Sequence, residues 1–371
     1  MAPAGRARAD RGEGGGGPMK RVREYVARWE ALLLVFLIGT FVFGAGVSRY
    51  FWTASNISIA TASFMPVAIV ALAMTLIIVT GEIDISVGSI VGLCAACLGV
   101  CLERGLPIGA AMPLSLVVGA LAGLGNGVMV AYVGLPSLVV TIGTLALYRG
   151  LAQIVLRERG VSDFPEWYQN IGFGTIGGSP VPWSSLIFAV LAIGFAVFLH
   201  ATRGGRALYA IGNNREAARF SGIAVKRGLL GLFVTSGVMC SVAAIVLTAY
   251  LASARSDTAS GLELQVITAV VLGGVDIFGG SGTMVGVVIA LFVLAFVQNS
   301  LGLAGVTPEA QQIATGGVLI ATLSVFGAAR FVRAHSAARG RFRRRRPRAL
   351  ATGGRPSGGG EESVKAHAGR E

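Results

Sequence analysis

Charged residues are scarce in this chain of 371 residues, where they make up 13% of the sequence against 54% hydrophobic residues. Soluble globular domains carry roughly 25% charged residues, so this chain has too few to cover a surface in contact with water. The shortage argues against a soluble protein and favours one whose exterior faces lipid. Glycine is abundant, with 54 residues, and small residues let membrane helices approach one another closely.

Residues for catalysis, metal binding and nucleotide binding are also few. The three histidines stand at the ends of apolar stretches or in the C-terminal tail, without a nucleophile–base pair. Cys94, Cys97 and Cys101 share one face of an apolar helix without a His or carboxylate beside them, which favours buried inert thiols over metal ligands. No Gly-x-x-x-x-Gly-Lys-Ser/Thr loop occurs, so the chain lacks that cradle for ATP phosphates. We therefore expect no enzyme activity, no metal and no cofactor.

Ten apolar stretches predict an all-α fold, a polytopic transmembrane helical bundle with about ten spans. The eighth stretch is short for a full crossing and is expected to be broken or re-entrant. Gly119, Gly123 and Gly127 give the fourth a small-residue face suited to tight helix packing. The predicted spans are 31–50, 57–80, 86–102, 108–132, 136–156, 184–201, 229–252, 265–280, 284–303 and 309–330.

Basic residues are concentrated in three stretches, 1–29, 200–230 and 330–348, which hold 22 of the 31 Lys and Arg residues. Basic loops beside hydrophobic spans stay in the cytoplasm, so both termini are predicted to be cytoplasmic. Five crossings then place loop 157–183 outside, one more returns loop 202–228 inside, and ten place the C-terminal tail inside as well. The expected location is the bacterial plasma (inner) membrane.

These charges divide the chain into three predicted parts: a transmembrane domain at 30–333 between disordered basic tails at 1–29 and 334–371. The run of four arginines at 343–346 is expected to be a solvated tail near anionic lipid headgroups. Nucleic acid is not an expected partner, because no aromatic-interleaved binding fold accompanies the positive charge.

Residues 81–85 resemble residues 273–277, and Asp84 and Asp276 occupy matching places in the two segments. This similarity predicts an internal repeat, parallel or inverted, of the kind found in many transporters. Carboxylates at membrane depth usually face a pathway or a partner.

A structural role for the same residues is weighed equally. Asp84 or Ser86 is well placed to cap the third span, and Ser89 to satisfy further backbone N–H groups there. The two roles are compatible.

Residues 205–222 are polar, lie between two spans and contain a helix-forming stretch. Asn213 or Asn214 is expected to cap a short helix here, and Gly222 to end it. A helix on the cytoplasmic face is suited to dock onto another protein. Taken alone, a simple amphipathic loop is the default interpretation.

Five stretches in a fixed order carry a resemblance: GEIDISVGSIVGL (81–93), LPSLVVTIGTLALYRGLA (135–152), GRALYAIGNNREAARFSGIAVKR (205–227), ITAVVLGGVDIFGGSGTMVGVVIAL (267–291) and VQNSLGLAGVTPEAQQIATGGVLI (297–320). Over roughly residues 57–330 the chain resembles the monosaccharide permeases of ATP-binding-cassette (ABC) importers, of ribose, xylose, galactose or rhamnose type. The family commonly has glycine where Glu82 stands. The residues after Gly222 lack the Ile-x-Leu-Pro end of the fullest EAA pattern.

The resemblance implies a membrane-spanning permease subunit that moves a small sugar into the cytoplasm, using ATP bound and hydrolysed by a partner. Implied partners are a cytoplasmic ATP-binding subunit, an external or periplasmic solute-binding protein and a second permease subunit, in a homo- or heterodimer within membrane lipid. The implied ATPase-coupling loop comprises Asn213, Asn214, Glu216, Ala217, Ala218 and Gly222. The translocation-pathway candidates are Asp84, Ser86, Ser89, Thr141, Thr144, Asp276 and Asn299.

Two alternatives stay open. The same machinery suits a nucleoside or an autoinducer-type furanose as well as another sugar. From a different class, an ion-coupled secondary transporter would use Asp84 and Asp276 as its proton or sodium site.

Overall fold

The computed structural model describes residues 18–157, 159–322 and 324. This part of the chain is built of helices joined by turns and loops, which confirms the all-α prediction. Residues 308–322 are helical as well. The named helices are α1 (Pro18–Val47), α2 (Ala54–Val79), α3 (Val87–Glu103), α4 (Ile108–Val128), the π-helix η1 (Met129–Val133), α5 (Ser137–Leu156), α6 (Glu166–Phe173), α7 (Trp183–Ala201), α8 (Arg203–Asn213), α9 (Arg215–Phe220), α10 (Val225–Leu251), α11 (Leu262–Leu272) and α12 (Met284–Leu303).

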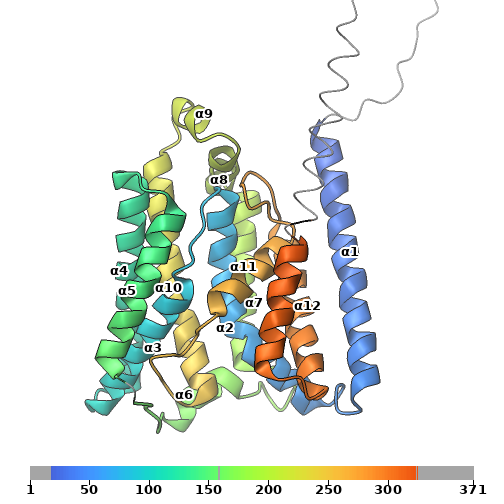
Figure 1. Cartoon of the computed structure of the whole chain (residues 1–371), viewed down its shortest axis with the longest axis vertical. Coiled ribbons are helices and arrows are strands. Elements are labelled where there is room, and N and C mark those ends of the chain that lie inside the picture. The colour runs from blue at the N-terminus through green and yellow to red at the C-terminus, as the bar shows by residue number, and fades with distance from the viewer. Residues whose placement is uncertain (1–17, 158, 323, 325–371) are drawn as a thin grey trace, which may run out of the picture. The chain divides into compact units, whose positions relative to one another are not determined.

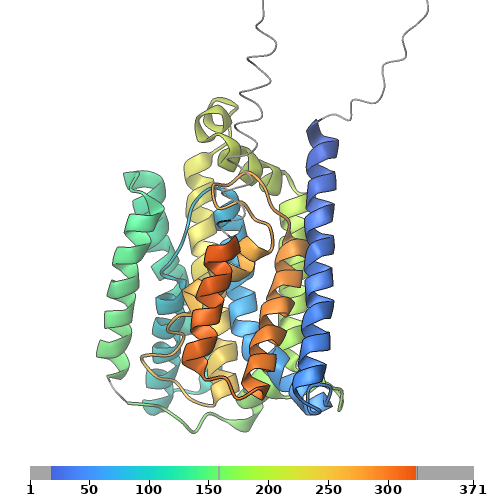
Figure 2. The ribbon, with the colours of Figure 1, turned by 45° about the vertical axis from the view of Figure 1, so that its right-hand side comes forward.

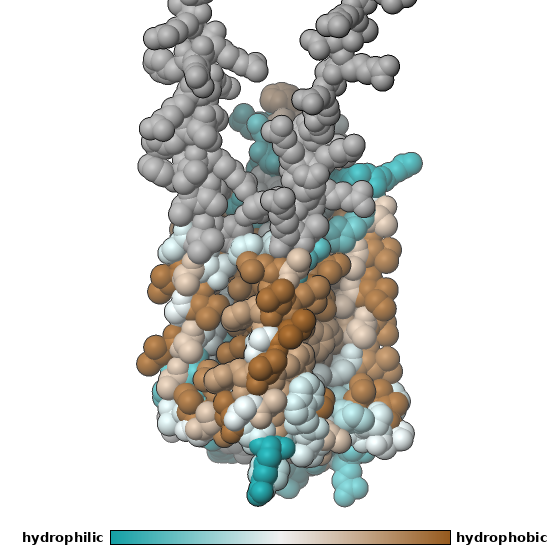
Figure 3. Space-filling view, turned by 90° about the vertical axis from the view of Figure 1, so that its right-hand side faces the viewer, coloured by the Kyte–Doolittle hydropathy of each residue, from teal (hydrophilic) through white to brown (hydrophobic). Residues whose placement is uncertain are grey.

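Seven of the described helices are long and apolar enough to cross a membrane: α1, α2, α4 with η1, α5, α7, α10 and α12. The apolar helices α3 and α11 have 17 and 11 residues, fewer than the roughly 20 that a full crossing needs. Apolar side chains form a broad band on the face beside α1 and α12, with hydrophilic residues below it (Figure 3). The polytopic membrane bundle predicted from the sequence is confirmed.

The two ends of the bundle differ. Helices α8 and α9 lie together at one end, which we call the α9 side, and α6 lies at the opposite end, the α6 side (Figure 1). The first residues of α1 lie towards the α9 side in both ribbon views (Figure 2). Loops 157–183 and 202–228 are therefore at opposite ends of the bundle.

Helix α2 forms the centre of the bundle and contacts α7, α10, α11 and α12. Its most apolar stretch is 94% buried, whereas that of α1, which packs against α12 at the edge, is 17% buried. A helix that is apolar on every side is expected to be surrounded by other helices. The sequence of α2 has this character throughout, and its position follows from it.

Helices α4 and α10 touch along their backbones. Gly119 and Gly123 of α4 face the carbonyl oxygens of Gly237 and Phe233, and a Cβ at either position would overlap those oxygens. Gly127, one turn further along α4, also faces α10. The small-residue face predicted for tight packing is therefore confirmed.

Two irregular segments enter the bundle and are each followed by a short helix. Helix α2 ends on the α9 side, and segment 80–86 leads back inward to α3, which continues to the α6 side (Figure 1). Helix α10 ends on the α6 side, and segment 252–261 leads back inward to α11, which continues to the α9 side. The two units run in opposite directions. This is an inverted arrangement of two re-entrant segments, 80–86 and 252–261.

The predicted eighth span, 265–280, is wrong in its extent, because α11 ends at Leu272. Residues 273–283 form a loop in which Gly274, Gly279 and Gly280 adopt positive φ angles of 87°, 85° and 81°. A helix cannot continue through left-handed residues, so the glycines end it. The expectation of a broken span is confirmed.

Parts of three predicted segments lie outside the described residues. These are residues 1–17 of the N-terminal tail 1–29, the whole C-terminal tail 334–371, and the end of the predicted span 309–330. Residues 18–29 belong to α1 in the structure.

Candidate functional site

A network of buried polar side chains surrounds the start of α3. The fully buried Asp84 carboxylate accepts hydrogen bonds from the Ser86 backbone N–H at 3.0 Å, the Ser86 hydroxyl at 2.6 Å and the Ser236 hydroxyl of α10 at 3.2 Å. The Asn126 amide of α4 donates to the Ser86 hydroxyl at 2.8 Å, and the Tyr148 hydroxyl of α5 lies 3.2 Å from the Asn126 side-chain oxygen. Side chains from α4, α5 and α10 thus converge on re-entrant segment 80–86.

The network satisfies polar groups that lie away from water, as buried polar groups require. Part of the predicted capping is wrong. Ser86 occupies the N-cap position of α3 without a side-chain cap bond, and the Ser89 hydroxyl donates to the Ser86 carbonyl at 2.7 Å instead of accepting from an N–H group. Asp84 supplies the local bond by accepting from the Ser86 N–H.

Helix α5 also contacts segment 80–86. The Ser137 hydroxyl accepts from the Ile83 N–H at 3.2 Å, and the Thr141 hydroxyl lies 3.4 Å from the Ile83 carbonyl oxygen. Thr141 bonds more closely to the Ser137 carbonyl, at 2.8 Å. Thr144 is buried one turn further on, with its hydroxyl 3.5 Å from the Thr141 carbonyl oxygen. The two predicted threonines therefore lie on the face of α5 that packs inside the subunit.

The predicted surface helix is present on the α9 side as α8 and α9. Asn214 caps α9, because its side-chain oxygen accepts from the Ala217 N–H at 2.9 Å. Gly222 follows the end of α9 with a positive φ of 83°. Asn213 instead donates to the Tyr209 carbonyl at 2.8 Å. The expected cap and the expected glycine stop are both confirmed.

The side chains of α9 divide between a buried face and an exposed one. Ala218 is buried within this chain, at 4% exposure, whereas Glu216 and Ala217 are exposed. Phe220 is 86% exposed, which is the largest exposure of any large hydrophobic side chain in the described part. Aromatic side chains are enriched among the residues that contribute most to protein–protein binding, so Phe220 is a candidate anchor for a partner.

An ion pair ties α9 to the re-entrant segment. The Arg215 guanidinium of α9 binds the Glu82 carboxylate, whose side chain is 8% exposed against 50% for Arg215. Partial burial lowers the pKa of Arg215 below its ordinary value. Only Ile83 separates Glu82 from Asp84, so the surface helix and the buried network contact the same short segment.

The loop 273–283 lies against α8 and the end of α2. Gly280 donates its N–H to the Val79 carbonyl at 2.8 Å, and Tyr209 of α8 donates to the Gly282 carbonyl at 2.7 Å. Burial raises the pKa of Tyr209 to about 12, so its hydroxyl keeps the proton that it donates. Asp276 is half-buried in this loop and accepts from the Phe278 N–H at 3.0 Å.

The similar segments 81–85 and 273–277 therefore approach each other on the same side. The inverted units of the fold are different segments, α2–α3 and α10–α11.

Asn299 lies near the other end of α12. Its amide and that of Asn56 bond to each other reciprocally, at 2.9 and 3.0 Å. Beside them a cavity of about 270 Å³ is lined in part by Ser63, Gln298 and Gln311. Asn299 is thus separated along α12 from Asp276, which precedes that helix.

The structure brings together Asp84, Ser86 and Ser89, with Thr141 one contact away through Ile83, and places Asp276 and Asn299 elsewhere. Sequence reasoning missed the partners Asn126, Ser236, Tyr148 and Arg215. The signal for the first two was a polar residue inside a predicted span. The signal for Arg215 was Glu82, a charge where the resembled family commonly has glycine.

The four cysteines are free thiols, with Cys94, Cys101 and Cys240 buried and Cys97 half-buried. Inert thiols were predicted for this stretch.

Comparison with known proteins shows the family to which the chain belongs. Residues 56–323 match the family described as the permease component of branched-chain amino acid transport systems. The autoinducer 2 import system permease protein LsrD of Photorhabdus temperata is 37% identical over 329 residues, covering 87% of this chain and 97% of that protein. The LsrD protein of Yersinia enterocolitica is 38% identical over 301 residues, covering 79% of this chain and 89% of that protein. No solved structure shows significant similarity to the chain.

These matches confirm the resemblance that the five sequence stretches carry. An importer of this kind works with an ATP-binding subunit and a solute-binding protein. The chain belongs to the family of branched-chain amino acid transport system permease components, and it is a multi-pass permease subunit of an ABC importer.

Proposed function

We propose that this subunit imports a small sugar-like molecule, with an autoinducer-type furanose as the first candidate, and that ATP is bound only by a partner. The proposal rests on α9, which is exposed and contacts segment 80–86 through the Arg215–Glu82 ion pair. A partner that binds α9 would therefore be connected directly to the membrane domain. The relatives' names, which specify autoinducer 2 import, support the choice of substrate.

The docking surface comprises Glu216, Ala217 and Phe220. Phe220 offers an apolar anchor, Ala217 permits close approach, and Glu216 offers a charge to a Lys or Arg of the ATP-binding subunit. Aromatic anchors commonly contribute 2 kcal/mol or more, roughly a thirtyfold change in affinity, when they enter a fitted pocket. Ala218 acts differently: it is buried, so it sets the position of α9 on this chain.

The α9 side faces the cytoplasm in this proposal, with both termini there and loop 157–183 outside. The basic residues of loop 202–228 support this orientation. The solute-binding protein would meet the α6 side. A second permease subunit, identical or related, would complete the transporter in the inner membrane.

The experiment is co-purification with the ATP-binding subunit encoded nearest this gene, followed by ATP-driven uptake in proteoliposomes. Phe220→Ala and Ala217→Trp should each weaken retention of that subunit at least tenfold and reduce uptake in proportion, while insertion stays normal. Phe173→Ala on α6 removes an exposed ring from the opposite side and is the matched control for retention of the ATP-binding subunit.

Full retention and full uptake in both α9 variants would refute this docking surface. Uptake that follows a proton or sodium gradient without any ATP-binding subunit would favour the ion-coupled alternative. The ligand of the partner solute-binding protein, measured by calorimetry against a furanose, a pentose and a nucleoside, tests the substrate.

A further inference from the structure

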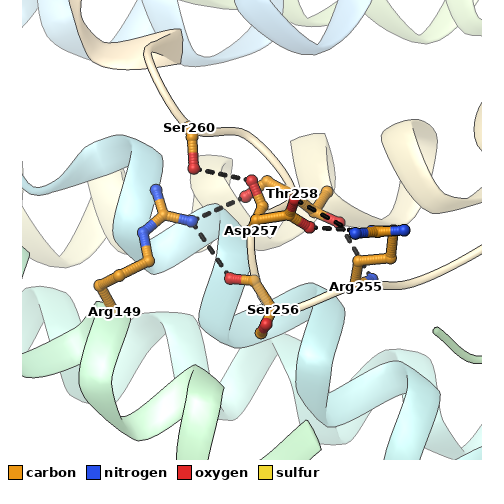
Figure 4. Close-up of polar contacts among 6 residues, drawn as sticks. All are labelled: Arg149, Arg255, Ser256, Asp257, Thr258 and Ser260. Carbon is orange, nitrogen blue, oxygen red and sulfur yellow. Dashed lines mark hydrogen bonds and ion pairs between the residues drawn. The ribbon is translucent and has the colours of Figure 1, made fainter. Parts of the chain in front are cut away.

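Helix α5 contacts both re-entrant segments. Near its start, Ser137 and Thr141 lie at the backbone of Ile83 in segment 80–86. Further along, Arg149 donates hydrogen bonds from one nitrogen, Nη1, to the carbonyl oxygens of Ser256 at 3.3 Å and Thr258 at 3.0 Å in segment 252–261 (Figure 4). Eight residues separate Thr141 from Arg149, or about 12 Å of helix. One straight helix therefore bridges the two inverted units.

Arg149 is an unusual residue for its position. It lies in a membrane-spanning helix, is half-buried, and forms no ion pair within the part of the chain that the structure describes. A charge in such a helix is costly and is kept where it serves a pathway or a partner. Its partners here are backbone carbonyls, which no change of side chain in segment 252–261 would remove.

Segment 252–261 is a compact turn. The Arg255 N–H donates to the Thr258 hydroxyl at 3.0 Å, the Ser260 hydroxyl donates to the Asp257 carbonyl at 2.7 Å, and Arg255 and Asp257 form an exposed ion pair at 3.0 Å. The two hydrogen bonds, drawn in Figure 4, make residues 255–260 one unit, and neither needs the Arg255 side chain. A displacement of Arg149 that is transmitted through the Thr258 carbonyl should therefore move the whole turn.

The turn lies against small residues of α3. A Cβ at Gly92 would stand 3.0 Å from both the Thr258 carbonyl oxygen and Arg149 Nη1, and one at Gly99 would stand 3.1 Å from the Ala254 Cβ. The turn is anchored at its outer end, where Ala254 and Val161 exchange backbone hydrogen bonds of 2.8 and 2.9 Å. Glycine has no side chain with which to hold the turn, so the hydrogen bonds from Arg149 are the specific contact at its inner end.

We propose that Arg149 is a positioning residue through which α5 makes the turn 255–260 follow the motion of α9. The linkage runs from Arg215 through Glu82 and Ile83 to α5, and from Arg149 to the turn. Each step is a contact in the structure. The inference rests on the proposed function, because α9 moves only if an ATP-binding subunit docks there. It adds a route by which ATP binding on the α9 side reaches the α6 side.

The test uses the full importer in proteoliposomes with Arg149→Met, Arg149→Lys and the control Arg255→Met. Arg255→Met removes the guanidinium group of the turn itself. The ion pair that Arg255 forms with Asp257 is exposed. For Arg149→Met we expect normal retention of the ATP-binding subunit and basal ATP hydrolysis within twofold, but at least a tenfold loss of uptake and of stimulation by the solute-binding protein. Arg149→Lys should recover part of both, since an ammonium group still donates to carbonyls.

A second readout separates linkage from folding. In a cysteine-free background, Arg255→Cys places a label on the exposed part of the turn and keeps the backbone hydrogen bond from residue 255 to Thr258. With Arg149 present, its labelling rate should change when nucleotide is trapped; with Arg149→Met the change should vanish while the ATP-binding subunit stays bound.

A nucleotide-dependent change that survives in Arg149→Met overturns the inference, and so does a loss of subunit retention in that variant, which would indicate a general defect of the fold. If the unmodified chain retains no ATP-binding subunit, the proposed function itself is refuted, whatever the Arg149 variants show. The inference then falls with it.

Discussion

Replacement of Asp84 distinguishes two roles for this residue. In the first, which we call the holding role, its hydrogen bonds stabilise segment 80–86; in the second, its carboxylate acts in the translocation pathway. The Asp84 carboxylate accepts from the Ser86 N–H, the Ser86 hydroxyl and the Ser236 hydroxyl, and is fully buried. In Asp84→Asn the amide oxygen keeps both bonds from Ser86. The amide N–H₂ donates to the Ser236 oxygen once that hydroxyl turns away. We therefore expect Asn to cost no more than about 1 kcal/mol.

Asp84→Ala removes every acceptor. It leaves the Ser86 N–H buried without a partner, which costs about 1–3 kcal/mol, and it adds a small cavity. The expected total is about 3–5 kcal/mol, or a drop in Tm of roughly 10 °C. Thermal unfolding of the purified subunit in detergent measures both variants, and uptake in proteoliposomes measures function.

The holding role predicts that Asp84→Asn is stable and transports at near the normal rate. An Asn variant as unstable as the Ala variant would contradict the hydrogen-bond reasoning. An Asn variant of normal stability that no longer transports would show that the carboxylate acts in the translocation pathway. That assignment stays a prediction for Asp84 and for the other pathway candidates.

Three further predictions follow from contacts described above. Gly123→Val should separate α4 from α10 and prevent assembly, seen as loss of the folded peak in size-exclusion chromatography, whereas normal elution would contradict the close packing. Glu82→Gln and Arg215→Met should each reduce uptake, because each removes an ion pair that solvent at the half-exposed Arg215 limits to about 1 kcal/mol. The double variant should be no worse than the more impaired single variant, and full additivity would mean that the two residues act separately. In intact cells a membrane-impermeant reagent should label a cysteine at Asn170 and not one at Ala217, and the reverse result would invert the proposed orientation.

The features predictable from the sequence were those set by periodicity and local backbone chemistry. Apolar runs located the long spans, the glycines of α4 marked its contact with α10, and Asn214 and Gly222 marked the two ends of α9. Each of these depends on residues close together in the chain. The short eighth span was also recognisable, because a run of glycines interrupts it.

Contacts between distant segments were not predictable in the same way. Asp84 meets Ser236, which lies 152 residues away, and Arg149 meets carbonyl groups that carry no side-chain signature at all. The similarity between residues 81–85 and 273–277 suggested a repeat, but the inverted units are α2–α3 and α10–α11. Inverted repeats commonly keep only weak sequence similarity, so the units α2–α3 and α10–α11 did not stand out in the sequence.

The buried network also sets an order of events during biosynthesis. Segment 80–86 leaves the ribosome long before Ser236, since 152 residues lie between that serine and Asp84. At about 5–20 residues per second, this amounts to roughly 8–30 s. During that interval the carboxylate lacks its partner on α10, and a polar segment cannot remain in bare lipid. The first re-entrant segment must therefore wait at the membrane surface or beside the insertion machinery until α10 arrives, which makes the nascent chain a substrate for membrane chaperones and proteases over that period.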